Sequence, residues 1–441
     1  MFNREKYLNQ LIERQHNNLV KVITGIRRSG KSYLLNNIFY NYLISKGVKK
    51  SNIIMFAFDA EEDIALLDRY LPDQPTVNSV NGQRIINNRK FLLYIQELTK
   101  SKGEYYLLLD EIQNLEDFVR VINGFLRHEN LDVYVTGSNS RFLSSQIDTE
   151  FSGRASRIHL LPLTYSEYLT GVDLSPRDAL EEYIRYGGIP LVELEKNDEG
   201  KVAQAISIYR DTYLSDVLKR HPQVDVNNLN ETLKVIASMI STSINPTRIE
   251  NTFKSEYKIK LSNGVIGNYI NWFEEAFLLN IAQRYDIKGR SYIGSPYKIY
   301  FEDIGIRNAI LNFRDVDETD IIENIVYNEL RYRGYSVDVG IVTIKEKTDR
   351  KDKNGNAIYV DKDTEVDFVA NKGSKTYYVQ VAYEIKTQKK KEQEYASIRN
   401  IPDSFKKIII VKEDGKPYYT EEGFLRINLI DFLSNIDSLD W

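Results

Sequence analysis

The fold of this chain is decided by one stretch near its beginning, Gly25-Ile-Arg-Arg-Ser-Gly-Lys31-Ser32. A short β-rich run, residues 18–24, precedes it, and a segment with apolar residues at helical spacing follows it up to Gly47. Between a strand and a helix, this spacing of glycines and lysine is typical of a phosphate-binding loop. The alternative, a chance glycine turn, is the weaker interpretation because both flanking elements are present. The stretch therefore predicts a nucleotide-binding α/β fold.

Each polar part of this loop has an expected role. Glycines let backbone N–H groups turn toward phosphate oxygens, and the start of the helix favours negative charge. Lys31 would reach the β- and γ-phosphates, and the Ser32 hydroxyl would ligate Mg²⁺. We therefore expect ATP and Mg²⁺ as cofactors. The residues expected to bind the nucleotide are Gly25, Ile26, Arg27, Arg28, Ser29, Gly30, Lys31, Ser32 and Tyr33.

Two acids end an apolar strand further along the chain, in the stretch Leu107-Leu-Leu-Asp110-Glu111. Asp110 would hold the metal through water, and Glu111 would align and polarise the attacking water. A strand that ends in solvated carboxylates is the alternative, and it would be the commoner case without the phosphate-binding loop. Together the loop and the acids predict ATP hydrolysis.

Further catalytic candidates follow the next strand. In Thr136-Gly-Ser138-Asn139, either Ser138 or Asn139 would lie beside the γ-phosphate, and a plain loop without this role is the alternative interpretation. Arg154, and less strongly Arg141, would stabilise the transition state, within the chain or from a neighbouring subunit. Most arginines are instead solvated or paired at the surface. An arginine that acts between subunits would imply a homo-oligomer.

The pattern of expected helices and strands changes along the chain. Strands and helices alternate up to residue 136, which predicts a parallel sheet covered by helices on both faces. A helical stretch follows, then three helices and a hairpin in the order of a winged helix. The polar, Gly/Asn/Lys-rich range 345–362 is expected to be an exposed loop. The expected domains are an ATPase core (1–165), a helical lid (166–225), a winged-helix domain (226–315) and a C-terminal α/β domain (316–441).

Acids gather again in the last of these domains. Glu365 and Asp367 lie two apart on a strand and so share a face, Gln380 lies on the next strand, and Glu323 lies on the opening helix. Such oxygen ligands would suit a second Mg²⁺. The layout is that of nucleases with a PD-(D/E)XK core, whose last strand should read acid-x-lysine. This chain has Gln380-Val-Ala instead, so a nuclease-like domain without activity is the favoured interpretation and a metal-dependent nuclease the alternative.

The sequence does not decide what the expected winged-helix domain binds. The helix opened by Ser262 would be the recognition helix if the domain read DNA, with asparagines meeting bases and wing residues meeting phosphates. Acidic residues nearby weaken any positive face, and winged helices also bind proteins. The candidate DNA-contacting residues are Asn263, Asn268, Asn271, Lys288 and Arg290, and the opposing acids are Glu274, Glu275 and Asp286.

Composition excludes several classes of chemistry. The 441 residues include no cysteine and only four histidines, which excludes disulfides, thiol nucleophiles and Cys-ligated metals. The net charge of −4 does not indicate a nucleic-acid binder. The longest apolar runs are too short to cross a bilayer, and Met1–Lys6 lacks the apolar stretch of a signal peptide. We therefore expect a cytoplasmic protein without a membrane partner.

The whole chain resembles the bacterial and archaeal AAA-type ATPases in which a winged helix and a nuclease-like domain of unknown function follow the ATPase. The resemblance implies a P-loop AAA-type core with a helical lid and a restriction-endonuclease-like end, and it implies ATP binding and hydrolysis. Gln380-Val-Ala is that family's own form, whereas 345–362 is longer than the family usually carries. The matching stretches are 25–32, 107–115, 136–139, 152–154, 161–168, 274–278, 284–289, 301–307, 323–330, 365–369 and 380–383.

Three functions stay open at this point. The first is an ATP-driven switch or remodeller whose C-terminal domains engage nucleic acid or a protein. The second is a nuclease gated by ATP, with Glu365 and Asp367 as metal ligands. The third is a nucleotide-bound signalling or antitoxin-like scaffold whose turnover is slow.

Overall fold

The computed structural model describes residues 2–80, 83–137, 151, 153–212, 217–257, 259–314, 318–351, 357–384 and 388–441. The chain divides into two units. The first is Asn3–Pro162 with Glu275–Phe277, and the second holds Met1–Phe2, Leu163–Glu274 and Leu278–Trp441. Among the described residues, no helix combines the length and the apolar character needed to cross a bilayer.

A five-stranded sheet forms the centre of the first unit, in the order β2-β5-β6-β1-β7. Every neighbouring pair is parallel, so all five carboxyl ends lie along one edge. This confirms the parallel sheet expected from the alternating strands and helices. The strands are β1 (Val20–Thr24), β2 (Ile53–Ala57), β5 (Tyr105–Asp110), β6 (Leu131–Thr136) and β7 (Ala155–His159).

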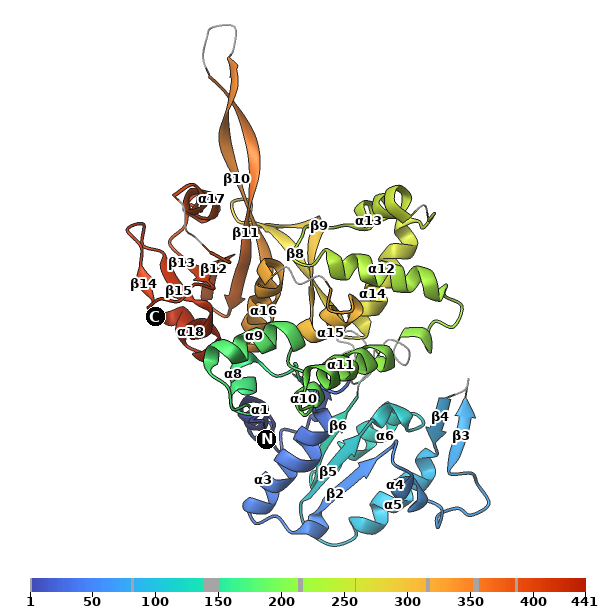
Figure 1. The fold of residues 1–441 in the computed structure, drawn as a ribbon. Coiled ribbons are helices and arrows are strands. Elements are labelled where there is room, and N and C mark those ends of the chain that lie inside the picture. The colour runs from blue at the N-terminus through green and yellow to red at the C-terminus, as the bar shows by residue number, and fades with distance from the viewer. Residues whose placement is uncertain are drawn as a thin grey trace. The chain divides into compact units, whose positions relative to one another are not determined.

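Helices cover both faces of this sheet because its side chains alternate between them. Val133 and Val135 of β6 belong to the core built with α4 (Glu61–Ala65), α5 (Asn88–Leu98) and α6 (Phe118–Phe125). Tyr134, between them, points the other way and packs on Phe39 at a ring-centroid distance of 4.6 Å. Figure 1 shows α3 and the group α4, α5 and α6 on opposite sides of the sheet.

The helix after the phosphate-binding loop spans nearly the range expected for it, but it contains a π-helical segment. A short antiparallel hairpin, β3–β4, was not expected from the sequence. The elements are α1 (Glu5–Glu13), α2 (Lys31–Tyr33), the π-helical Leu34–Phe39, α3 (Tyr40–Ser45), α4 (Glu61–Ala65), β3 (Val77–Val80), β4 (Gln83–Ile86), α5 (Asn88–Leu98) and α6 (Phe118–Phe125), with 3-10 turns at Lys50–Asn52 and Ile112–Asn114.

The second unit begins with helices, and local capping explains where several of them start. The Ser175 side chain accepts a hydrogen bond from the Asp178 N–H, and Pro176 occupies the first turn of α9. The Asn245 side chain likewise accepts a hydrogen bond from the Arg248 N–H, and Pro246 occupies the first turn of α13. The helices are α8 (Tyr165–Leu169), α9 (Pro176–Tyr186), α10 (Pro190–Glu193), α11 (Asp198–Thr212), α12 (Val226–Ser238), α13 (Pro246–Thr252) with the π-helical Phe253–Tyr257, α14 (Asn263–Glu275), α15 (Ile304–Ile310), α16 (Glu318–Tyr332), α17 (Gln388–Arg399), α18 (Leu429–Ser434) and the 3-10 turn Ser438–Asp440.

An eight-stranded sheet completes this unit, in the order β14-β15-β13-β12-β11-β10-β8-β9. The hairpin β8–β9 follows three helices, as expected, but β8 also pairs in parallel with β10. The strands assigned to a winged helix therefore share one sheet with those assigned to the C-terminal domain. The strands are β8 (Leu279–Asp286), β9 (Ser291–Phe301), β10 (Ser336–Lys351), β11 (Ala357–Lys372), β12 (Lys375–Ala382), β13 (Lys406–Val411), β14 (Tyr418–Tyr419) and β15 (Leu425–Asn428).

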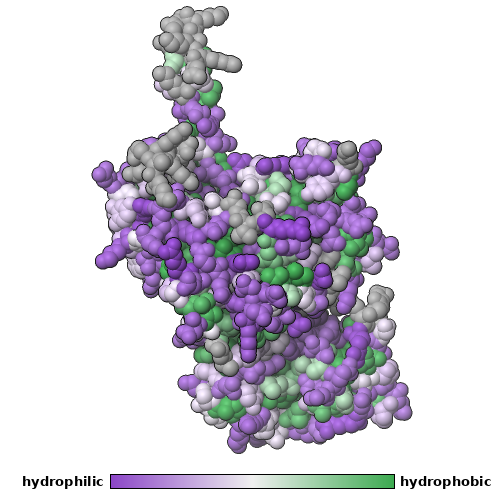
Figure 2. Space-filling view, viewed as in Figure 1, coloured by the Kyte–Doolittle hydropathy of each residue, from purple (hydrophilic) through white to green (hydrophobic). Residues whose placement is uncertain are grey.

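The prediction of a loop over 345–362 was wrong, because β10 and β11 continue through most of this range as an antiparallel hairpin (Figure 1). The charged side chains suggested a loop, but opposite charges pair across the strands. Lys345 faces Asp361 in the register, and the Lys362 Nζ lies 2.8 Å from Glu346 Oε1. Figure 2 shows mostly hydrophilic side chains on the hairpin below its grey tip. Residues 352–356 lie outside the described residues.

Candidate nucleotide-binding site

The phosphate-binding loop leaves β1 and enters α2, and two glycines set its course. Gly25 has a φ of 140°, and a Cβ there would lie 2.2 Å from the Leu160 carbonyl oxygen, so a larger residue would clash. Gly30 has a φ of 96° and caps α2, and a Cβ there would meet nothing within 4 Å. Gly30 is therefore required by its left-handed backbone rather than by crowding. The space beside it is open to a ligand.

Lys31 folds back over this loop. Its side chain is buried, and Nζ donates to the carbonyl oxygens of Gly25 and Ile26, both at 3.0 Å. Neutral carbonyl groups are weaker partners for an ammonium than charged oxygens are. The lysine is therefore held at the loop in a position from which it would turn to phosphate oxygens.

Arg4 holds the loop from behind, a role that no sequence pattern indicated. Arg4 is 4% exposed, and its guanidinium donates to the carbonyl oxygens of Ser29 at 2.9 Å, Leu161 at 2.6 Å and Pro162 at 3.3 Å. Ser29 precedes the capping glycine, and Leu161 and Pro162 follow β7. Arg4 therefore ties the loop to the segment that leaves the sheet.

Replacing Arg4 by lysine should raise the KM for ATP about tenfold and change kcat less. Lysine keeps the charge but has no planar fork to reach several carbonyls, and one charge-assisted hydrogen bond is worth about 1.5–3 kcal/mol. Steady-state ATP titrations of the two proteins measure the effect. Arg84→Lys is the matched control, because Arg84 is exposed and its ion pair with Glu61 is exposed as well. An unchanged KM in a folded Arg4→Lys variant would contradict this positioning role.

Asp110 and Ser32, the residues expected at the metal, lie together. Asp110 ends β5 and is 6% exposed, and its carboxylate is hydrogen-bonded by the hydroxyls of Thr136 and Ser32. Burial raises the pKa of Asp110, while these two hydrogen bonds and the charge of Lys31 oppose the rise. Thr136 Oγ1 also accepts a hydrogen bond from the Glu111 N–H at 3.0 Å. The neighbouring strands β5 and β6 therefore fix both acids relative to the loop.

Glu111 turns out of the strand at this edge. Its φ of 52° is left-handed, a conformation that costs a non-glycine residue energy and often occurs at functional sites. The Gln113 side chain, which is 7% exposed, donates from Nε2 to Glu111 Oε2. The turn and this hydrogen bond together orient the carboxylate.

A third carboxylate, Asp59, belongs to the same edge, and the sequence analysis missed it. It follows β2, the neighbour of β5, and parallel strands end side by side. Burial raises the pKa of Asp59, the charges of Glu111 and Asp110 raise it further, and the charge of Arg27 lowers it. Its place after a buried strand in a predicted parallel sheet was the signal that could have found it.

Of the remaining catalytic candidates, the structure describes only Arg154, and it lies away from the loop. Ser138, Asn139 and Arg141 lie outside the described residues. Arg154 lies at the opposite end of β1, where its carbonyl accepts from the Val20 N–H at 2.9 Å. The five residues of β1 separate it from the loop by about 16 Å at a strand rise of about 3.3 Å per residue. Within one chain Arg154 does not reach the phosphate-binding loop, so a catalytic role for it stays a prediction for a neighbouring copy.

The C-terminal acids do come together, but around a lysine. Lys298 Nζ lies 2.9 Å from Glu323 Oε1, 2.6 Å from Glu365 Oε1 and 3.9 Å from Asp367 Oδ1. Burial alone would lower the pKa of Lys298, but the charges of the three acids outweigh it and raise this pKa above its usual range. Gln380, on β12, accepts a hydrogen bond from Ser397 Oγ at 3.5 Å. Whether these acids bind a metal stays a prediction.

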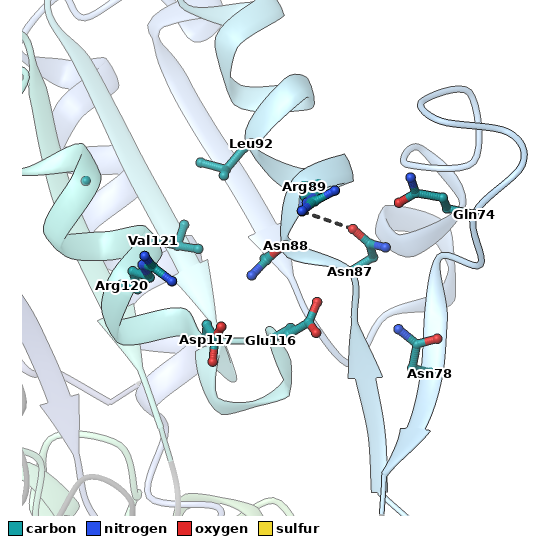
Figure 3. Close-up of a pocket in the computed structure, with 11 residues that line it drawn as sticks. Gln74, Asn78, Asn87, Asn88, Arg89, Leu92, Glu116, Asp117, Arg120 and Val121 are labelled. Carbon is teal, nitrogen blue, oxygen red and sulfur yellow. Dashed lines mark hydrogen bonds between the residues drawn. The ribbon is translucent and has the colours of Figure 1, made fainter.

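A separate pocket of about 600 Å³ lies in the first unit, between the hairpin β3–β4 and the helices α5 and α6 (Figure 3). Its lining is polar, and the Asn87 side chain accepts from the Arg89 N–H at 3.0 Å. None of its residues was singled out by the sequence analysis. The lining residues are Gln74, Asn78, Asn87, Asn88, Arg89, Leu92, Glu116, Asp117, Arg120, Val121 and Gly124.

The residues around the phosphate-binding loop, at the edge of the sheet where the strands end, fit a nucleotide with bound Mg²⁺. The space beside Gly30 is open, an ammonium lies at the loop, and a hydroxyl meets a carboxylate at Ser32 and Asp110. Hydroxyl and carboxylate oxygens are ligands that Mg²⁺ accepts. A parallel sheet with this loop after β1 and these acids after β5 defines the class of P-loop ATPase domains.

Comparison with known proteins agrees with this class. The family model described as an AAA domain matches residues 17–169, and a model described as a domain of unknown function matches residues 177–317. A Haemophilus influenzae protein described as uncharacterized is 33% identical over 448 residues, which cover 100% of this chain and 98% of that protein. The chain therefore belongs to the same family as this protein, a family with an AAA-type P-loop ATPase domain.

Two more distant similarities are also found. An uncharacterized protein of Methanocaldococcus jannaschii is 26% identical over 428 residues, which cover 94% of this chain and 85% of that protein. Among solved structures, the Walker-type ATPase of Pyrococcus abyssi matches with a TM-score of 0.47 and 16% identity, over 70% of this chain and 96% of that one.

Proposed function

We propose that this chain is a Mg²⁺-dependent ATPase that acts as a switch or remodeller on a partner of its C-terminal region. The observation that supports this most is the hydrogen-bonded set Ser32, Asp110, Thr136 and Glu111 beside Lys31. A phosphate-binding loop without such acids would serve binding alone. Hydrolysis also needs a metal ligand and a general base, and the two acids would supply them.

The roles follow from these positions. Mg²⁺, when bound, neutralises phosphate charge. Ser32 and Asp110 would hold it, and Lys31 would exchange its carbonyl partners for phosphate oxygens. Glu111, oriented by Gln113, would accept a proton from the water that attacks the γ-phosphorus. The bond from that phosphorus to the bridging oxygen breaks, which leaves ADP and inorganic phosphate.

The partner of the switch is either nucleic acid or a protein, and the nuclease alternative is disfavoured. Lys298 lies among Glu323, Glu365 and Asp367, where a nuclease would hold its metal. A homo-oligomer is part of the proposal, because Arg154 would serve only the site of another copy.

A panel of single-stranded and duplex DNA and RNA, added to ATPase assays, distinguishes a nucleic-acid partner from a protein partner. Stimulation by one of them identifies nucleic acid, and flat turnover favours a protein.

Replacing Asp110 by asparagine should raise the Mg²⁺ concentration needed for half-maximal turnover about 10- to 100-fold, the usual cost of losing a residue that orients metal ligands. Asparagine keeps the shape but loses the charge. Phosphate release measured across a Mg²⁺ titration, with EDTA as the blank, tests this. Asp73→Asn is the matched control, because Asp73 is exposed in the same unit.

Two results would count against the proposal. Turnover that persists in EDTA, or that does not change in Asp110→Asn, would show that the metal site is assigned wrongly. Tight retention of nucleotide through purification with negligible turnover would favour the third hypothesis, a nucleotide-bound scaffold.

A further inference from the structure

The acidic cluster of the second unit contains a cation of its own. Lys298 lies on β9 and is 3% exposed, so its ammonium is removed from bulk water. Its Nζ is within 3 Å of one oxygen each of Glu365 and Glu323, at 2.6 and 2.9 Å, and 3.9 Å from Asp367 Oδ1. The ammonium therefore lies among all three acids.

Strand β9 presents two donors to this cluster on one face. Lys298 and Tyr300 are two residues apart, so their side chains point the same way. The Tyr300 hydroxyl donates to Glu323 Oε1 at 2.6 Å, the same oxygen that Lys298 approaches. Tyr300 itself is fully buried. The carboxylate of α16 is thus held by β9 through a charged and a neutral donor.

Other oxygens of the cluster are also engaged by the protein. Asp367 Oδ2 accepts from the Val381 N–H at 2.7 Å, and Glu365 Oε2 accepts from Ser243 Oγ at 3.3 Å. Mg²⁺ demands near-octahedral oxygen ligands at about 2.0–2.1 Å. A divalent ion would have to displace these donors and share carboxylates with an ammonium of the same sign, which repels it.

We propose that the ammonium of Lys298 is the resident cation of this cluster and takes the place of a divalent metal. Burying a carboxylate is unfavourable unless a counter-charge accompanies it, and a lysine on the chain supplies that charge without dissociating. The cluster then ties β9, α16 and β11 together as an ion-paired centre and holds no metal. This inference goes beyond the proposed ATPase, since it concerns residues that the ATP reaction does not use.

Mn²⁺ titration of the nucleotide-free full chain, followed by electron paramagnetic resonance of free Mn²⁺, tests the proposal. Wild type, Asp367→Asn and Glu365→Gln should give isotherms that coincide within about twofold. The partly exposed Glu365 makes the second variant the safer one for folding, because 34% of its side chain is accessible. A wild-type Mn²⁺ site that either substitution weakens tenfold or more would overturn the proposal.

The second arm removes the lysine. Lys298→Met should gain about one Mn²⁺ per chain, and the double variant Lys298→Met/Asp367→Asn should lose it again. Lys234→Met is the matched control, because Lys234 is exposed and pairs with Glu231 on one helix. A folded Lys298→Met protein that gains no Mn²⁺ would overturn the proposal. If this variant does not fold, the comparison of wild type with Asp367→Asn and Glu365→Gln still decides it.

Discussion

Replacing Lys31 by alanine is expected to reduce kcat/KM for ATP at least about a hundredfold, the scale of losing one charged donor to a transition state. The ammonium lies at the loop, 3.0 Å from the carbonyl oxygens of Gly25 and Ile26, and the helix start alone cannot replace it. Nucleotide binding should weaken as well, because the lysine would contact phosphates in the ground state. Phosphate release and titration with a fluorescent ATP analogue measure the two effects.

A matched control accompanies this variant. Lys49→Ala removes an exposed lysine from the same unit, away from the loop, and should behave as wild type. Thermal unfolding of both variants shows whether the fold is intact. Wild-type turnover in a folded Lys31→Ala protein would show that ATP is hydrolysed elsewhere.

Replacing Glu111 by glutamine should reduce kcat about 10²- to 10³-fold, as expected for the loss of a general base. ATP affinity should stay within about threefold, because the substitution removes no group assigned to the phosphates. The structure places the carboxylate at the sheet edge and orients it through Gln113. Single-turnover hydrolysis together with equilibrium ATP binding separates the loss of chemistry from a loss of binding.

The control for this variant is Glu104→Gln, because Glu104 is 71% exposed and precedes β5, at the other end of that strand. Unchanged ATP hydrolysis in Glu111→Gln would show that Glu111 is not the general base. Asp59, the third carboxylate of the edge, would then be the next residue to replace.

Most of the first unit was predictable because its signals are local. The stretch Gly25 to Ser32 and the acids after Leu109 are short patterns whose meaning depends on the strand and helix beside them. Alternating strands and helices predicted the parallel sheet, and the sheet then brings Ser32, Asp110 and Glu111 to one edge. Whether these residues perform the predicted chemistry stays with the experiments above.

The local sequence was least informative where the pairing of strands decides the position of a residue. The range 345–362 has the composition of a loop, but Lys362 and Glu346 find each other across two strands. The sequence left open whether Arg154 acts within its own chain. The register of β7 beside β1 places it at the end of the sheet away from the loop, so its catalytic role stays a prediction for a neighbouring copy. In both cases the pairing of strands from distant parts of the chain decides where the side chain lies, so the local sequence could not show its position.

The amino-acid sequence alone predicts the phosphate-binding loop, the acids at the end of β5 and the parallel sheet. The first two are short local patterns, and the sheet follows from a repeated period. In the cluster around Lys298, the sequence grouped the three acids as candidate metal ligands, but only the tertiary structure adds the lysine. Its members Glu323, Glu365 and Asp367 come from α16 and β11, and the lysine that holds them lies on β9. Charges so far apart in sequence meet only when the sheet closes over them, because the cost of burying them selects a counter-charge in space and not in sequence.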